Sequence, residues 1–148
     1  MKLSRRITGL ILLLGPLCGC TEELGPVAMP VATVEGMVTE GILPVSGGWI
    51  EFTPVEGTIG RLRSARLGND GRFVAEGVAV GINQVRLVNA RIDGRPYRGV
   101  FSLSYSTIRR EVSPYDAKPI AIDLLIEQAK FQKRFERLQA GPKRGANP

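Results

Sequence analysis

Residues 33–54 read TVEGMVTEGILPVSGGWIEFTP, and this stretch decides the fold class. Its first part alternates apolar and polar residues with Val34 and Val38 on one parity, and its last part alternates again with Ile50 and Phe52 on one parity. A period of two residues is typical of a strand that buries one face. We therefore expect strands over 32–39 and 49–53, joined by the glycine- and proline-containing loop 40–48.

The rest of the chain continues the same pattern. Asn69-Asp70-Gly71 signals a turn, because these residue types tolerate a positive φ. The segment KPIAIDLLI (118–126) places every second residue on one apolar face. Further strands are expected over 61–67, 72–75, 83–89, 100–105, 108–112 and 118–126. About seven strands within residues 32–126, with no helical period between them, predict an all-β fold, an antiparallel β-sandwich.

The first twenty residues have the order of a secretory signal. Lys2, Arg5 and Arg6 precede an apolar run over 7–17, and small residues follow. The run is shorter than the roughly 20 residues that cross a bilayer, which disfavours the alternative of an N-terminal membrane helix. We assign residues 1–19 to a signal peptide.

Leu17-Cys18-Gly19-Cys20 resembles the bacterial lipobox, in which an aliphatic, a variable and a small residue precede the lipid-accepting cysteine. The resemblance implies cleavage before Cys20, a diacylglycerol on its sulfur and an acyl chain such as palmitate on the new amine. Several acyl chains hold a protein on a membrane far more firmly than one. The alternative is an ordinary signal peptide that leaves Cys20 as a free thiol. Residues 20–31 are then the lipidated cysteine and a tether.

A C-terminal amphipathic helix is expected after the sandwich. Residues 127–140 (EQAKFQKRFERLQA) have helix-favouring composition, apolar residues recur near helical spacing, and Gly141-Pro142 ends the pattern. We assign 127–148 to a basic helix and the chain end. Three positions for the helix remain open, in order of preference: packed on the sandwich, on a membrane surface, or on a partner.

The positive charge of the chain is concentrated at its two ends. The whole chain has 20 Lys and Arg against 14 Asp and Glu, whereas residues 20–126 carry 11 against 12. The sequence isoelectric point of about 9.8 therefore does not indicate nucleic-acid binding, and no nucleic-acid partner is predicted.

The residue inventory argues against catalysis and metal binding. The chain has no histidine, and its only cysteines are Cys18 and Cys20, so neither a zinc site of Cys and His nor a histidine base is available. We predict no catalytic, cofactor or metal residue, and lipidation of Cys20 is the one predicted site. The less favoured alternative is a His-free hydrolase that uses carboxylates or Lys118 as the base. Its candidate nucleophiles are Ser46, Ser64, Ser102, Ser104, Ser106 and Ser113.

Two motifs in order resemble the carboxypeptidase regulatory-like domain, which has a transthyretin-like sandwich. The first is the V-x-G-x-V strand with a Gly pair and F-x-P, here starting at Val34 and ending at Pro54. The second is the turn 67–73 followed by a strand with alternating Val85 and Leu87. The sequence departs from that pattern at Gly68, where the family has Asp, and at Asn83, where an aromatic is commoner. With the lipobox, the chain is similar to small planctomycete-type lipoproteins, which implies a non-enzymatic domain.

Four further features have competing interpretations. Trp49 is expected in the core, and an exposed Trp49 would instead favour a carbohydrate-binding module. Residues 69–71 are expected to form a hairpin turn rather than a calcium loop. Tyr97-Arg98-Gly99 resembles the end of hydroxyisourate hydrolases, but that family's histidines have no counterpart here. Two arginine clusters are expected to be solvated, at Arg61, Arg63, Arg66 and Arg72 and at Arg109 and Arg110.

The sequence thus predicts a cell-envelope lipoprotein, anchored through Cys20 to the outer membrane or to the periplasmic face of the inner membrane. Its sandwich is expected to be a non-catalytic structural or interaction module that binds an envelope protein or a polysaccharide.

Overall fold

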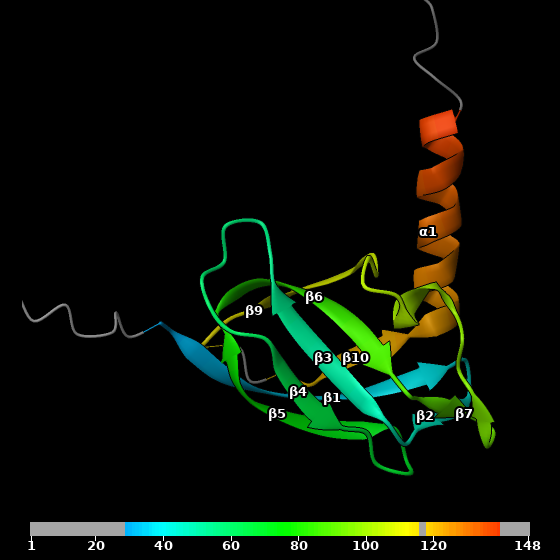
Figure 1. The fold of residues 1–148 in the computed structure, drawn as a ribbon, viewed down its shortest axis with the longest axis horizontal. Helices are drawn as coiled ribbons and strands as arrows, with labels where there is room; N and C mark the ends of the chain where they lie inside the picture. Colours follow the sequence, from blue (N-terminus) through cyan, green and yellow to red (C-terminus); the bar gives the residue numbers. More distant parts are fainter. Residues whose placement is uncertain (1–28, 116–117, 140–148) are drawn as a thin grey trace, which may run out of the picture.

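The computed structural model of the chain describes residues 29–115 and 118–139. Two β-sheets pack face to face, and one helix follows the last strand (Figure 1). The all-β sandwich and the C-terminal helix predicted from the sequence are confirmed.

The first sheet is built around the long strand β1 (Val31–Glu40). One edge of β1 pairs with β10 in the parallel sense, and its other pairings, with β5 and β2, are antiparallel. Two short strands extend the sheet beyond β2. Its other members are β2 (Leu43–Ser46), β5 (Arg72–Ala79), β7 (Arg91–Ile92), β8 (Arg95–Pro96) and β10 (Ile120–Asp123).

The second sheet is antiparallel throughout, in the order β4-β3-β6-β9. Its strands are β3 (Trp49–Pro54), β4 (Arg63–Arg66), β6 (Gly81–Val88) and β9 (Ile108–Val112). In β3 the register places Ile50 opposite Ala65 and Leu87, and all three side chains are buried. The alternation read from residues 49–53 therefore sets which face of this sheet enters the core.

The core lies between the two sheets. The fully buried side chains include Val38, Phe52, Val85 and Ile122, and the rings of Phe52 and Phe73 lie 5.8 Å apart. Gly36 allows β1 to approach this core closely, since a Cβ there would collide with the carbonyl oxygen of Ile120 and the ring of Phe73. The glycine of the V-x-G-x-V pattern is therefore a packing requirement.

The two lateral sides of the sandwich differ. On one side β4 and β5 lie against each other, although they belong to different sheets. On the other side, within the part of the chain that the structure describes, β9 pairs only with β6 and β10 pairs only with β1, so each has one strand edge without a described partner. Charged residues on β9, such as Arg109 and Glu111, are a common protection of such an edge.

The turn at residues 69–71 is confirmed, but it is not a hairpin. It joins β4 of the second sheet to β5 of the first. Gly71 adopts a φ of 78°, and the Asp70 Oδ1 accepts a hydrogen bond from the Arg72 amide at 3.1 Å. The chain uses this turn to cross between the two layers.

Three short strands were missed in the sequence because each pairs over only two residues per neighbour. β2 lies in the segment expected to be a loop, and β7 and β8 form a hairpin around Asp93 and Gly94, both at positive φ. The strand predicted over 100–105 is wrong. Val100–Ser102 forms a 3₁₀ turn, η1, that buries Phe101, and the Ser102 hydroxyl donates to the Gly99 carbonyl at 2.7 Å.

The prediction of a strand over 118–126 and a helix from 127 is also wrong at its boundary. β10 ends at Asp123, and α1 (Leu124–Gln139) begins at once. The Asp123 Oδ1 accepts hydrogen bonds from the amides of Leu125 (2.9 Å) and Gly41 (3.1 Å). Asp123 caps the first turn of the helix, and this stabilisation outweighs the apolar pattern of residues 118–126, which by itself does not distinguish a strand from a helix.

The helix α1 packs on the sandwich only through its first turn. Its buried residues are Leu124 and Glu127, and the remainder stands away from the two sheets (Figure 1). Docking along the sandwich, the first of the three expected positions, is therefore correct only for this turn. The N-terminal end of β1 and the helix lie at opposite ends of the long axis (Figure 1).

Candidate functional site

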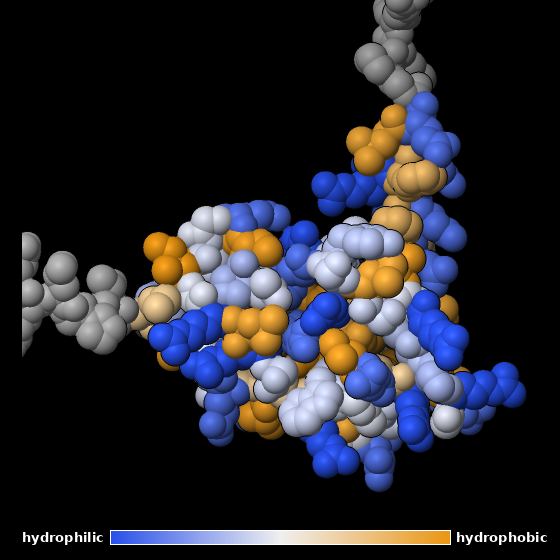
Figure 2. Space-filling model, viewed as in Figure 1, coloured by the Kyte–Doolittle hydropathy of each residue, from blue (hydrophilic) through white to orange (hydrophobic). Residues whose placement is uncertain are grey.

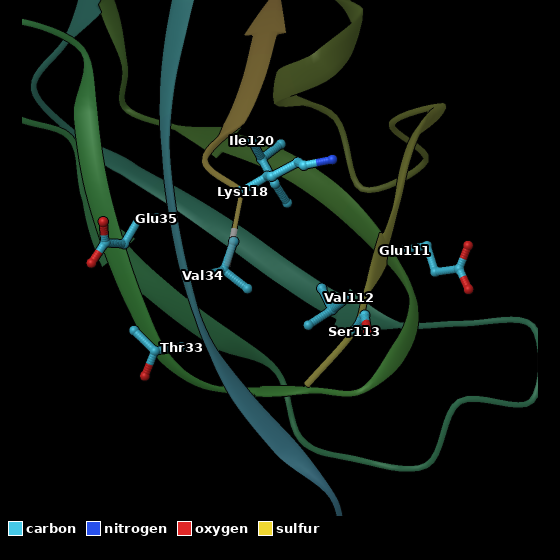
Figure 3. A pocket seen from close by; sticks show the side chains of 8 residues that line it. All are labelled: Thr33, Val34, Glu35, Glu111, Val112, Ser113, Lys118 and Ile120. Carbon is cyan, nitrogen blue, oxygen red and sulfur yellow. The ribbon is translucent and has the colours of Figure 1, made fainter. Parts of the chain in front are cut away.

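A cavity of about 670 Å³ opens on the side of the sandwich where β9 and β10 have unpaired edges (Figure 3). Val34 and Val112 are nearly inaccessible and form its apolar floor. Charged and polar residues surround this floor. The full lining is Thr33, Val34, Glu35, Glu111, Val112, Ser113, Lys118 and Ile120.

The ionisable groups of this cavity do not converge. Figure 3 shows the carboxylates of Glu35 and Glu111 on opposite sides, each pointing away from the other. Lys118, proposed as a base in the hydrolase alternative, lies at the rim. An acid and a base that act on one substrate must both reach the reacting atoms. The cavity therefore does not bring an acid and a base together at one point.

The candidate serines are scattered over the fold, and only Ser113 lines the same cavity as Lys118. The Ser113 hydroxyl accepts a hydrogen bond from the Tyr115 amide at 3.3 Å. Ser106 is buried, and its hydroxyl accepts from the Ile108 amide at 3.4 Å. The others lie in β2, β4, η1 and the loop after η1: Ser46, Ser64, Ser102 and Ser104.

The outer face of the second sheet presents Trp49, so the prediction of a core tryptophan is wrong. Ile50 and Phe52 take the inward positions of β3, which leaves Trp49 46% exposed on the opposite parity. The register places Arg66 of β4 and Val88 of β6 beside it. A flat aromatic ring next to hydrogen-bonding groups is a common means of holding a sugar ring.

Two positions further along the same face, Glu51 and Arg86 form an ion pair. The Arg86 Nε donates to the Glu51 Oε2 at 2.9 Å, and both side chains are largely shielded. The carboxylate of Glu51 can still accept hydrogen bonds from a polar ligand, and the guanidinium of Arg86 can still donate them. No pattern in the sequence indicated this pair, because the two residues are 35 positions apart and meet only through the strand register.

Glu127 is held by two cations at the base of α1. Its Oε1 accepts from Arg110 Nη2 at 2.9 Å and from Lys130 Nζ at 2.8 Å, and the side chain is 9% exposed. Burial alone would raise the pKa of Glu127, but the hydrogen bonds and charges of Lys130 and Arg110 lower it below its ordinary value of 4.5. Sequence reasoning placed Arg110 in a solvated cluster and missed this pair.

Glu127→Gln is expected to lower the free energy of unfolding at pH 7 by about 1 to 3 kcal/mol, because it removes a charged acceptor from two donors. Since the folded-state pKa is below the unfolded value, the unfolded chain binds more protons as the pH falls. The stabilisation is thus present above pH 4.5 and is lost as the pH drops through the folded-state pKa. Urea unfolding of both proteins across this range measures the difference.

The matched control is Glu136→Gln on the exposed part of the same helix, which should change the stability by less than about 0.5 kcal/mol. If the wild type and Glu127→Gln differed equally at pH 7 and well below 4.5, the ion pair would not fix the helix base.

The arginine clusters are divided among separate partners. Arg63 donates to the Gly77 carbonyl at 3.1 Å, Arg72 lies 3.4 Å from Asp70, and Arg109 lies 3.5 Å from Glu56. All cluster members are exposed except Arg110, which is half-buried. Exposed pairs of this kind contribute little to stability, which fits their expected solvated character.

Tyr97-Arg98-Gly99 has a structural place next to the core. Tyr97 packs partly against the buried cluster, and its amide donates to the Ala90 carbonyl at 2.8 Å. Burial raises the pKa of the Tyr97 hydroxyl, so the phenol stays protonated at neutral pH.

Asn83, one of the two positions that depart from the carboxypeptidase regulatory-like pattern, is buried. Its side-chain amide nitrogen donates to the carbonyls of Ala79 (2.8 Å) and Gly81 (3.1 Å), and these hydrogen bonds hold the turn before β6 in place.

Cys20, residues 1–19 and most of the tether lie outside the described residues. Within 29–115 and 118–139, no three Cys, Asp or Glu side chains gather as a metal site. In the same part of the chain, no helix is long and apolar enough to span a membrane.

No protein-family model, curated protein or solved structure matches the chain.

Proposed function

We propose that this protein is a cell-envelope lipoprotein, held by lipid on Cys20, whose transthyretin-like sandwich is a non-catalytic binding module. One observation carries the proposal: Cys20 directly follows the basic and apolar segment and stands eleven positions before the first strand at Val31. Eleven extended residues reach at most about 40 Å. An anchored domain would therefore work close to the membrane surface, in the outer membrane or on the periplasmic face of the inner membrane.

The binding role is supported by the surfaces of the domain. The cavity beside β9 and β10 has an apolar floor and carboxylates that point apart, and Trp49 is displayed on an open sheet face. Such surfaces are suited to holding a partner. The resemblance to the carboxypeptidase regulatory-like domain agrees with this role and forms part of the proposal.

The test is intact-mass analysis of the protein purified from native membranes. We expect a chain that begins at Cys20 and is heavier by a diacylglycerol and an acyl chain. Cys20→Ala should release the protein into the soluble fraction, and the matched control Cys18→Ala should remain lipidated in the membrane. An unlipidated mature chain, or equal behaviour of the two variants, would overturn the anchor.

Exposed Trp49 favours carbohydrate binding as a second candidate function. Trp49 is the sole tryptophan of the chain, so its fluorescence reports directly on contact with a sugar ring. Titration with soluble peptidoglycan fragments should shift its emission, and Trp49→Ala should abolish binding measured by calorimetry. The exposed Tyr105→Ala variant should bind normally. Equal binding by all three proteins would exclude the face around Trp49 as the sugar-binding surface.

A further inference from the structure

We infer that the projecting part of α1, residues 128–139, is a second membrane contact that lies on an anionic lipid surface. The inference rests on the proposed function for the presence of a membrane near the domain. It concerns different residues from the lipid anchor, so each can be tested without the other.

The projecting part of α1 lacks the contacts that normally stabilise a helix of this length. Only Leu124 and Glu127 are buried, both in the first turn. Helices of roughly 12 to 15 residues are marginal in water unless one face packs on another surface. A surface that covers the remaining turns would therefore stabilise the helix.

An apolar stripe runs along this projecting part. Phe131, Phe135 and Leu138 are separated by four and three positions, which places them on one face of a helix. The rings of Phe131 and Phe135 stack at 6.3 Å, and Phe135 and Leu138 remain 53% and 75% exposed. Figure 2 shows apolar and strongly hydrophilic residues interleaved along the helix. Phe131 is half-buried, and the rest of the stripe faces solvent.

The charges beside the stripe indicate which kind of surface it contacts. Residues 128–139 carry four cations (Lys130, Lys133, Arg134 and Arg137) against one anion, Glu136. Arg134 lies three positions after Phe131 and four before Leu138, so its long side chain borders the stripe. Basic residues next to aromatic and leucine side chains are the pattern of a helix in the headgroup region of anionic lipids.

The same charges disfavour a second copy of the chain as the occupant. Gln128, Phe131, Phe135 and Leu138 have a coiled-coil spacing, but a dimer through this seam would bring two helices of like net charge together. An anionic membrane attracts the helix by the same charges. A membrane surface could also reach this part of the helix, because the helix stands clear of the sheets (Figure 1).

The test uses residues 21–148, without the lipid-accepting cysteine. This chain keeps the whole core, which extends from Val34 to Leu124. Cosedimentation is measured with vesicles of equal parts phosphatidylglycerol and phosphatidylcholine, and with vesicles of phosphatidylcholine alone. We expect binding to the first at low salt, at least tenfold weaker binding to the second, and loss of binding at high salt.

Two double variants separate the contributions. The first is Lys133→Glu with Arg137→Glu, which should weaken binding at least tenfold, since one basic residue near an anionic surface contributes about fivefold in affinity. The second is Phe135→Ser with Leu138→Ser, which should also weaken binding at least tenfold, because it removes the apolar side chains that enter the headgroup region. The matched control reverses the same number of charges on the sandwich, at the exposed Arg61 and Arg66, and should bind within about twofold of the unchanged chain. Circular dichroism and thermal melts confirm that each variant is folded.

The inference is overturned if the chain does not bind anionic vesicles, or if the Arg61 and Arg66 control loses binding as strongly as the helix variants. It is also overturned if light scattering shows a dimer that Phe135→Ser with Leu138→Ser dissociates and that does not bind lipid. Failure of lipidation at Cys20 would leave these results unchanged, so the two proposals fail separately.

Discussion

Phe101→Ala is expected to lower the free energy of unfolding by about 3 to 5 kcal/mol, the range for deleting a fully buried aromatic side chain. Phe101 is 0% exposed and belongs to η1, a turn that lies against β6. The ring therefore fills core volume from a segment that is not part of either sheet. Denaturant unfolding monitored by circular dichroism measures the change.

Because the total stability of a small domain is about 5 to 15 kcal/mol, Phe101→Ala alone can leave too little folded protein to analyse. Phe101→Leu keeps most of the volume and should lose about 1 kcal/mol. Leu103→Ala, two residues further on at a side chain 39% exposed, should lose about 1 kcal/mol or less. If Phe101→Ala cost no more than Leu103→Ala, η1 would not close the core.

Gly36→Ala is expected to cost about 3 kcal/mol, at the upper end for an added methyl group in a packed interior. The new Cβ would meet the Ile120 carbonyl, which cannot move without loosening the pairing of β1 with β10. It would also meet the ring of Phe73, which is itself buried. Thermal and urea unfolding should show the loss without a change in secondary structure.

Gly94→Ala is the matched control for Gly36→Ala. Gly94 has a φ of 71° with nothing near its missing Cβ, so alanine there bears only the backbone penalty of about 1 to 2 kcal/mol. If Gly36→Ala cost less than Gly94→Ala, the close approach of β1 to β10 and Phe73 would be adaptable.

The fold class could be predicted because the longer strands bury one face with a strict period of two residues. Ile50 and Phe52 in β3, and Val85 and Leu87 in β6, are buried as this period requires. The same rule fails where other interactions decide the conformation. Residues 101–105 alternate in polarity, yet Val100–Ser102 forms η1 and no strand follows it before β9. The short strands β2 and β7 depend on pairing partners distant in sequence.

The candidate sites were less predictable than the fold. Trp49 was expected in the core because a single tryptophan at the start of a strand more often packs there, but Ile50 and Phe52 already fill the inward face of β3. The Glu127 ion pair depends on α1 starting at Leu124, which in turn depends on Asp123 acting as a cap. A capping aspartate before an apolar run was the signal in the sequence that could have placed the helix start.

The parallel pairing of β1 with β10 has a consequence for the order in which the chain acquires structure. Gly36 lies opposite Ile120, so the first strand cannot complete its ladder until nearly the whole chain has been synthesised. Contacts between such distant segments require a large loop to close and slow the folding reaction. During N-to-C synthesis the nascent chain therefore remains without its complete first sheet until β10 emerges. A chain that stops before residue 120 would expose the edge of β1 and lose Ile122 and Leu124 from the core.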